Sequence, residues 1–363
     1  MTKVRRVSAL QSSAILVLAA CAFAWPGMAG AQTGDQAKPA GEPLSLTVSL
    51  GDVSLTKLPF IMAADHGIYE KNGLKVRQFI SPSAAKVVKA RGINVPTENI
   101  SSDKGDIDIG GASPTIVRMT TIAGAPQRVV LATTDHWSRY HILTRADIKK
   151  PEDLKGKRIG YGNFGALNHF SLMMYFKEIG IDPEKDVSMF SNAQEIHNIT
   201  DGTVDVVAGN GNVVVQAKEA GLNDLVNLTP KKIDMPGSSV NADKKWLPNN
   251  KEAARRFIKA TVEAIALTMQ DKEKAFASIR KWYGMSDPAM MEVMYSEAAD
   301  LPKKPYPSIE GLKNMQSVYK WREITRFKPE DFVDASFVTE LDKSGYIDSL
   351  YKKTEGSATA KQQ

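Results

Sequence analysis

Cysteine is nearly missing from this chain of 363 residues, in which Cys21 is the only one. If the N-terminal segment is removed on export, the remaining chain can form no disulfide, no thiolate metal site and no cysteine nucleophile. Aromatic residues make up only 7% of the chain, while 24% are charged and 42% hydrophobic. These fractions exclude a disordered or collagen-like chain. At about 150 residues per domain, the length predicts two domains or two lobes.

Several catalytic signatures are also missing. The sequence holds no H-E-x-x-H, no G-x-S-x-G and no P-loop, and no carboxylate spacing marks a pair for acid–base work. The five histidines are scattered, at His66, His136, His141, His169 and His197. Without metal-binding spacing, each is expected to be structural. We therefore expect no catalytic residue, no metal and no cofactor, and a protein that is not an enzyme.

The first 31 residues have the layout of a secretory signal peptide. A basic start at Lys3 precedes an apolar stretch from Val7 to Trp25, and Ala29-Gly30-Ala31 forms an A-x-A cleavage site. A membrane anchor is disfavoured, because polar residues at 11–13 leave the run short of the roughly 20 apolar residues that a span needs. The sequence thus predicts a signal peptide over residues 1–31 and a periplasmic protein.

Lipid anchoring is the alternative for this segment. Leu18-Ala19-Ala20-Cys21 resembles a bacterial lipoprotein signal in which Cys21 would be lipidated. The apolar stretch continues past Cys21 to the A-x-A site, which favours cleavage after Ala31. Residues 1–31 carry three basic and no acidic side chains, so their removal lowers the formal charge from +6 to +3. This mild charge, with no basic run, predicts no binding to nucleic acid.

Strands and helices alternate after a polar leader over residues 32–44. The expected strands are 46–50, 74–80, 106–109, 128–132, 140–144, 157–161, 187–190 and 204–208. Such alternation predicts mainly parallel sheets flanked by helices, whereas residues 249–345 read as mainly helical. We expect an α/β, two-lobed fold with lobe 1 over 45–135, lobe 2 over 136–235, a helical return to lobe 1 over 236–352 and a tail over 353–363.

Ligand sites in open α/β sheets lie beyond the carboxyl ends of the strands. Two junctions in lobe 1 are therefore candidates. The first, Gly51-Asp52-Val53-Ser54, contributes Ser54. In the second, Gly110-Gly111-Ala112-Ser113-Pro114, Ser113 is expected to cap a helix and Pro114 to be its first residue. Free N–H groups at that helix start favour an anionic group, although a capped helix with no ligand explains the motif equally well.

Gly160-Tyr161-Gly162-Asn163-Phe164-Gly165 matches the G-x-G-x-x-G dinucleotide fingerprint after a strand. A dinucleotide site needs an acidic residue at the end of the next strand to contact the ribose, but that strand ends in Ser191-Asn192. The export signal also argues against a nicotinamide cofactor. We instead expect a backbone-lined wall at Gly165, with Asn163 and Phe164 directed into the cleft.

Two further segments complete the candidate site. Gly209-Asn210-Gly211-Asn212 follows a strand, so Asn210 and Asn212 are candidates for ligand contact or for a plain turn and helix cap. Trp137 and Arg139 lie where the chain crosses between lobes. They suit an aromatic or anionic ligand, while a buried Trp and an interlobe salt bridge are the simpler interpretation, which we slightly favour for Arg139.

A set of ordered motifs resembles the nitrate/sulfonate/taurine-type periplasmic binding proteins of ABC importers. The matching segments are Leu58-Pro59-Phe60 with Gly67-Ile68-Tyr69-Glu70 and Gly73-Leu74-Lys75-Val76, then Asp106–Gly110, Glu152–Gly160 and Gly202–Val206. The resemblance runs from about residue 45 to 351. It departs from the family over 81–98, which is longer, and at 209–212, which replaces the usual W-x-P.

The resemblance implies a two-lobed, type II-like binding-protein fold that delivers its ligand to an ABC permease, which works with an ATPase subunit. We expect a monomer that closes on a small organic ligand, which is anionic, a sulfonate among the candidates, or aromatic. By this analogy the pocket includes Ser54, Ser113, Asn163, Phe164 and Asn210. A sensor for a chemoreceptor or kinase is one alternative. An enzyme of thiamine-pyrimidine synthesis on the same fold is another, weakened because those enzymes carry a cysteine-rich motif.

Overall fold

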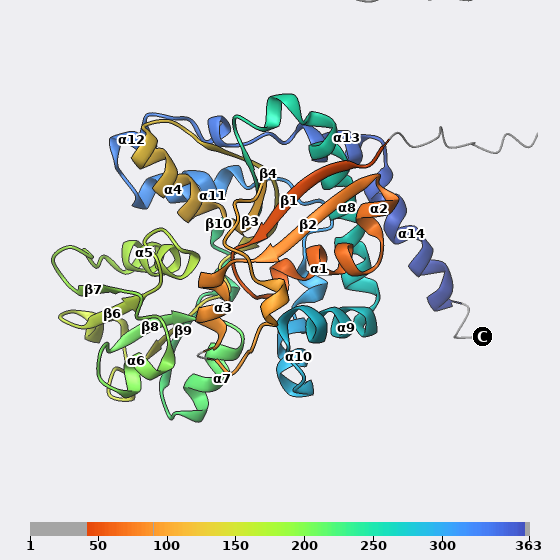
Figure 1. Ribbon diagram of the computed structural model, residues 1–363. Coiled ribbons are helices and arrows are strands. Elements are labelled where there is room, and N and C mark those ends of the chain that lie inside the picture. The colour runs from red at the N-terminus through yellow and green to blue at the C-terminus, as the bar shows by residue number, and fades with distance from the viewer. Residues whose placement is uncertain (1–41, 90, 360–363) are drawn as a thin grey trace, which may run out of the picture. The chain divides into compact units, whose positions relative to one another are not determined.

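The computed structural model describes residues 42–89 and 91–359. The predicted signal peptide, Cys21 and nearly all of the predicted leader therefore lie outside the described residues. Within the described part, ten strands form two five-stranded sheets, each flanked by helices (Figure 1). The α/β fold with two lobes that the sequence predicts is confirmed.

The first sheet has the strand order β2-β1-β3-β10-β4. Its strands are β1 (Leu44–Leu50), β2 (Leu74–Ile80), β3 (Ile107–Gly111), β4 (Arg128–Trp137) and β10 (Asp234–Asp243). β1 runs parallel to β2 and β3, and β10 runs antiparallel to β3 and β4. Along β1, buried Val48 and Leu50 alternate with half-buried Thr47 and Ser49, so one face joins the apolar core and the other stays polar.

The second sheet repeats this plan in the order β7-β6-β8-β5-β9. Its strands are β5 (His141–Thr144), β6 (Arg158–Tyr161), β7 (Ser188–Ser191), β8 (Val206–Gly209) and β9 (Asn223–Asn227). β6 is parallel to β7 and β8, while β5 is antiparallel to β8 and β9. Each sheet is therefore mainly parallel, with one reversed strand next to one edge.

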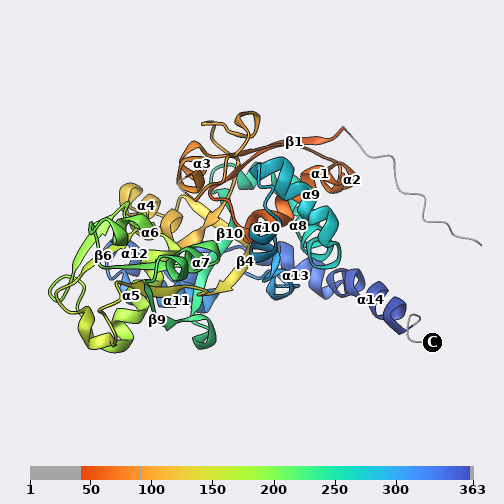
Figure 2. The same ribbon diagram turned by 90° about the horizontal axis from the view of Figure 1, so that it is seen from below.

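Helices cover both sheets (Figures 1 and 2). They are α1 (Leu58–Asp65), α2 (Ile68–Lys71), α3 (Pro82–Lys89), α4 (Ala112–Ala123), α5 (Leu167–Ile179), α6 (Ile196–Thr200), α7 (Asn212–Glu219), α8 (Lys251–Gln270), α9 (Lys272–Tyr283), α10 (Pro288–Tyr295), α11 (Ile309–Val318), α12 (Arg322–Thr325), α13 (Ser336–Lys343) and α14 (Tyr346–Thr359). α1 and α8 pack together in the large core of the first sheet, and α5, α6 and α7 contact the second. None of the described helices is both long and apolar enough to cross a lipid bilayer.

Three strands differ from the sequence prediction. β4 continues to Trp137 through residues expected to form a polar crossing, and β9 and β10 occupy segments in which no strand was expected. β4 and β10 pair with each other in the first sheet. Each strand satisfies the other's polar groups: the hydroxyls of Thr133 and Ser239 lie 3.0 Å apart, and Thr134 donates to the Ser238 carbonyl at 3.0 Å. Pairing between these strands thus stabilises a β conformation, although their polar side chains taken alone predict a loop.

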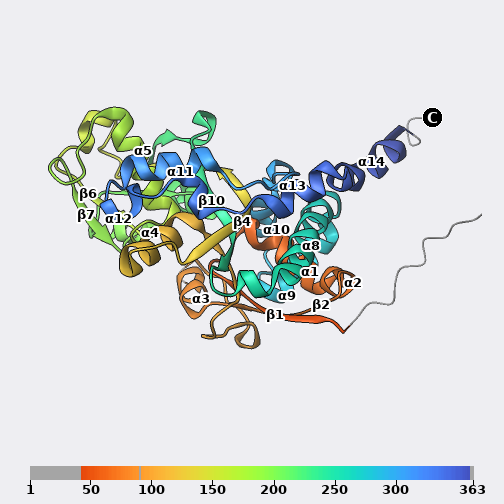
Figure 3. The same ribbon diagram turned by 90° about the horizontal axis from the view of Figure 1, so that it is seen from above.

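The C-terminal return contacts both lobes. α8 and α9 pack with α1, whereas α11 contacts α5 as well as β10 (Figure 3). Phe170 of α5 shares a core cluster with Leu312 and Met315 of α11. The return therefore does not stay with the first sheet alone. The last helix extends to Thr359, through most of the segment that the sequence predicts to be a loose tail.

Candidate ligand-binding site

A cavity of about 780 Å³ lies where the strand ends of both sheets meet. The first sheet contributes residues 51–57 after β1 and Gly110 and Gly111 at the end of β3. The second contributes Gly162 and Asn163 after β6 and residues 209–212 at and after β8. These are the carboxyl ends of the strands, where open α/β sheets bind ligands. The volume is in the range of cavities that enclose a small organic molecule.

Five of the residues selected from the sequence line this cavity. They are Ser54, Arg139, Asn163, Asn210 and Asn212. Two come from lobe 1 or the crossing, and three from the second sheet, so residues more than a hundred positions apart meet around one space. Gly211 supplies the positive φ of the turn and caps α7, which leaves both Asn210 and Asn212 in ordinary conformations beside the cavity.

Three other selected residues do not belong to the lining. Phe164 was expected to form a wall of the cleft. Its ring instead packs at 4.7 Å from the His169 ring and stacks at 4.8 Å on Trp321. Gly165 has a positive φ of 78° and donates its N–H to His169 at 3.3 Å. Trp137 is half-buried at the end of β4, with the Lys232 ammonium 5.0 Å from its ring. Packing therefore accounts for all three.

The helix after β3 begins earlier than expected. Gly111 occupies the N-cap position of α4, and the helix starts at Ala112. Ser113 is therefore the second helical residue and not the cap, and Pro114 is the third. Proline is tolerated there because the first-turn N–H groups have no partner within the helix. The side chains of Ser113 and Pro114 lie outside the described part, so their contact with a ligand stays a prediction.

The glycine fingerprint has a packing explanation. A Cβ on Gly160 would lie 1.9 Å from the Ala193 carbonyl oxygen, which real structures do not allow. Gly160 is therefore required by the close approach of the segment after β7. Asn192 donates its N–H to the Gly162 carbonyl at 3.0 Å and has a φ of 57°. These contacts explain the motif without a dinucleotide.

Lys57 belongs to the lining of the cavity, with only 1% of its side chain exposed. Its ammonium forms an ion pair with Asp52 and donates to Thr56 Oγ1 at 3.0 Å and to Ser238 Oγ at 2.7 Å. Ser54 Oγ donates to the same Asp52 carboxylate at 2.6 Å. An ammonium has three donors, so the Lys57 side chain is fully used within the protein.

A second carboxylate–cation pair lies on the polar face of the first sheet. Asp108 accepts from Arg128 at 2.6 Å and from the Ser49 hydroxyl. Arg128 is 3% exposed and Asp108, which lines the cavity, is 31% exposed. The register places Ser49 opposite Asp108, so sheet pairing itself positions this carboxylate.

Arg139 contacts three carboxylates near the crossing. Its guanidinium lies 3.4 Å from Asp135, 3.5 Å from Glu297 and 3.1 Å from Asp300. Burial raises the pKa of Asp135 to about 6, and the nearby Arg139 opposes this rise. Burial likewise raises the pKa of Tyr140, with Asp52 and Asp135 adding to the effect. Arg139 thus forms salt bridges from the segment that connects the two sheets, and it also lines the cavity.

The remaining charged residues of the lining were not selected from the sequence. Asp52 and Asp108 lie inside motifs that were quoted for other residues, so their polarity next to a strand end could have identified them. Gln194 follows the end of β7 by three residues but was not selected. Arg91 and Glu297 come from loops away from any strand-end motif, and only the tertiary fold brings them to the cavity. Among the described residues, no group of three or more His, Cys, Asp or Glu is arranged to hold a metal ion.

Comparison with known proteins places this geometry in context. No curated protein matches the chain. The alkanesulfonate-binding protein SsuA from Xanthomonas axonopodis pv. citri, bound to MOPS, is 15% identical with a TM-score of 0.61, covering 82% of this chain and 100% of its own. The nitrate-binding protein NrtA from Synechocystis PCC 6803 is 16% identical with a TM-score of 0.55, covering 87% and 89%. The desulfurization enzyme DszB is 13% identical with a TM-score of 0.53, covering 83% and 99%.

These likenesses show the fold, since all are below 25% identity. Two of the three solved relatives are periplasmic or sulfonate-binding proteins and one is an enzyme, so the resemblance inferred from the motifs is confirmed for the fold. The family model described as NMT1/THI5-like matches residues 56–275. Because that segment is more than half of the chain, the protein belongs to the NMT1/THI5-like family.

Proposed function

We propose that this protein is an extracytoplasmic solute-binding protein that encloses a small organic molecule and delivers it to an ABC importer. The observation that carries the proposal is the cavity of about 780 Å³ lined by strand ends of two sheets, in a fold shared with sulfonate- and nitrate-binding proteins. The predicted signal peptide supports a periplasmic location. The expected partners are a membrane permease and, through it, an ATPase, and we expect the binding protein to act as a monomer.

Capture would proceed by closure of the two lobes. Only two segments connect the sheets, residues 138–140 between β4 and β5 and residues 228–233 between β9 and β10. Few connections allow a hinge in which a small number of residues absorb the rotation. Ligand bound between the lobes would stabilise the closed form, and this form would be recognised by the permease.

The fold also accommodates enzymes, which makes catalysis the second candidate. Among the described lining residues there is neither a cysteine nor a histidine. The cavity therefore lacks, within the described part, the nucleophile–base pairs that covalent catalysis commonly uses. A sensory role would use the same binding chemistry with a different membrane partner.

A thermal-shift screen tests the proposal. The purified protein would be scanned against organic acids, sulfonates, nitrate, pyrimidines and amines. A true ligand at about a hundred times its dissociation constant should add ~2.7 kcal/mol of stability. Recovery of the added compound unchanged after hours of incubation supports binding without turnover. A converted product would favour the enzyme. Failure of every class to shift the melting curve would contradict solute binding, and co-purification with a permease would separate transport from sensing.

A further inference from the structure

The charges around the cavity are unequal in number and in exposure. Seven charged side chains belong to the described lining: the cations Lys57, Arg91 and Arg139, and the carboxylates Asp52, Asp108, Asp135 and Glu297. The carboxylates thus outnumber the cations. In a partly enclosed site such an excess repels anions more strongly than it would in bulk water.

Each lining cation is already held by a carboxylate. Lys57 uses its three donors on Asp52, Thr56 and Ser238. Arg91 donates Nε and Nη2 to the two oxygens of Glu195, at 3.0 and 2.9 Å. Arg139 contacts three carboxylates, described above. A sulfonate or carboxylate ligand would therefore meet no uncompensated cation among the lining side chains that the structure describes.

The exposed partner of two ion pairs is the carboxylate. Asp52 is 46% exposed and its partner Lys57 1%. Asp108 is 31% exposed and its partner Arg128 3%. Both carboxylates line the cavity. Arg128 does not line it, and Lys57, which does, is almost fully buried. A ligand entering the cavity therefore meets negative oxygen atoms before it meets the cations that balance them.

Gln194 adds an independent need for a hydrogen-bond donor. Its Nε2 donates to Glu195 Oε1 at 3.2 Å, which fixes the orientation of the amide. Its Oε1 is buried and has no hydrogen-bond partner, although Gln194 belongs to the cavity lining. A buried acceptor without a partner costs free energy, and a hydrogen-bond donor that reaches this atom would recover it.

We propose that the ligand is a small organic cation, bearing a primary ammonium or amidinium group that binds between the Asp52 and Asp108 carboxylates. The inference rests on the proposed function and names the ligand class for that same cavity. It replaces the anionic ligand expected from the sequence, which followed from free N–H groups at a helix start without knowledge of the carboxylates. Charge-assisted hydrogen bonds from an amidinium would be about twice as strong as neutral ones.

Matched probes test the charge preference. Titration calorimetry with the purified protein would compare benzamidine, benzylamine, benzamide and benzenesulfonate, and then 1-butylamine with 1-butanesulfonate. Each set keeps its skeleton and changes only the head group. The cationic members should bind at least about tenfold more tightly than the anionic members, and raising the salt concentration should reduce that preference.

Substitutions locate the effect. Asp108→Asn should weaken binding of the cationic probe about tenfold, since it removes one of the two proposed contacts. Because that change leaves Arg128 buried without its partner, Glu297→Gln provides a second variant at a side chain that is 41% exposed. It should weaken cation binding about threefold. Glu292→Gln is the control: it lies on α10, pairs with Lys272 and does not line the cavity, so binding should not change.

The outcomes separate the two proposals. Tighter binding of the sulfonate or of the neutral amide would overturn the cationic ligand while supporting solute binding. Equal weakening by Glu297→Gln and Glu292→Gln would also overturn it. If no compound in the matched sets or in the wider screen binds, solute binding itself is contradicted, and the inference about its ligand fails with it.

Discussion

Arg91 and Glu195 join the two lobes beside the cavity through two N–H···O hydrogen bonds of 3.0 and 2.9 Å. Arg91 follows α3 on the side of the first sheet, and Glu195 is the N-cap residue of α6 on the side of the second. Their side chains are 22% and 11% exposed. A bidentate pair shielded from water in this way is stronger than an ordinary surface pair.

Arg91→Gln should weaken the closed arrangement of the lobes. The change leaves Glu195 largely buried without its cation, which in other proteins costs several kcal/mol. We expect the dissociation rate of bound ligand to rise about tenfold and amide hydrogen exchange in α6 to increase. Arg77→Gln is the control, since Arg77 and Asp103 are both more than half exposed. Equal dissociation rates in the two variants would argue against a closing role for Arg91.

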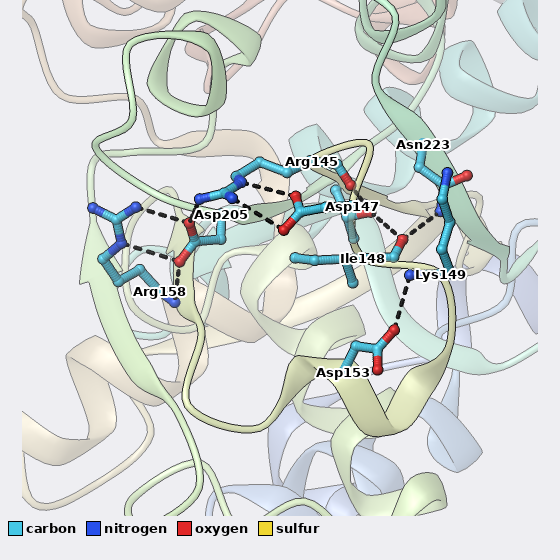
Figure 4. A network of polar contacts seen from close by, with 9 residues as sticks. Arg145, Asp147, Ile148, Lys149, Asp153, Arg158, Asp205 and Asn223 are labelled. Carbon is cyan, nitrogen blue, oxygen red and sulfur yellow. Dashed lines mark hydrogen bonds and ion pairs between the residues drawn. The ribbon is translucent and has the colours of Figure 1, made fainter.

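Asp205 makes the stability of the second sheet depend on pH. Figure 4 shows this carboxylate between Arg158 and Arg145. Hydrogen bonds from the Arg158 side chain lower the pKa of Asp205 to about 2. A lowered pKa in the folded state means that the stabilisation is present above about 4 and is lost as the pH falls through 2.

Asp205→Asn should therefore lower the free energy of unfolding by about 2 kcal/mol at pH 7. The difference from the unmodified protein should narrow as the pH falls toward 2, as measured by urea denaturation at several pH values. Asp147→Asn changes a carboxylate that pairs with Arg145 on the exposed side of the same network and should have little effect. A constant difference across the pH range would contradict the assigned role of Asp205.

Ligand binding should depend on the ionisation of Asp135. Its raised pKa of about 6 means that much of it is protonated below that pH. For a cationic probe, affinity should fall by up to about tenfold between pH 7 and pH 5. The ligand-free protein should show the opposite trend: the stability linked to this group is present below about 4 and is lost as the pH rises through 6, because a buried carboxylate must then ionise.

The groups that face Asp135 set the controls. Arg139 lowers the pKa of Asp135, and Glu297 raises it. Asp300 also pairs with Arg139. Burial and the nearby Arg139 lower the pKa of the adjacent His136. Asp135→Asn should flatten the pH profile of cation binding, measured by calorimetry. His136→Gln should keep the profile; a profile that disappears with His136 instead would assign the titration to the histidine.

The sequence predicts the strand–helix order well where local periodicity is clear. β1 and β2 were expected almost as they are, because alternating apolar residues identify one buried face. β10 was missed, since Pro236 and Gly237 interrupt it and its pairing with β3 and β4 is a tertiary effect. Its register shifts between Asp234 and Ser238 accommodate these two residues.

The candidate site was predicted only in part, for a related reason. Strand-end motifs led to Ser54, Asn163 and Asn210, which line the cavity. The sign of the cavity's charge could not be read from them. The sign of the charge depends on which member of each ion pair is more exposed, as Asp52 is compared with Lys57. It also depends on loops that the tertiary fold brings to the cavity, such as the one that carries Arg91. Phe164 was assigned to the cleft because its partner Trp321 lies far along the chain.

Gly160→Ala should destabilise the second sheet by about 2 kcal/mol or more, because the added methyl group would overlap the Ala193 carbonyl, at 1.9 Å. The obstacle is backbone and cannot rotate away, so β6 or the segment after β7 must shift. Gly162→Ala is the matched control in the same motif: its nearest atom is Gln194 Oε1, at 3.4 Å on a flexible side chain, and its φ is not in the left-handed region. Thermal denaturation of both variants should lower the melting temperature for Gly160→Ala alone. Destabilisation by Gly162→Ala of the same size would mean that the motif is constrained by something other than the contact with Ala193, and the dinucleotide interpretation would have to be reconsidered.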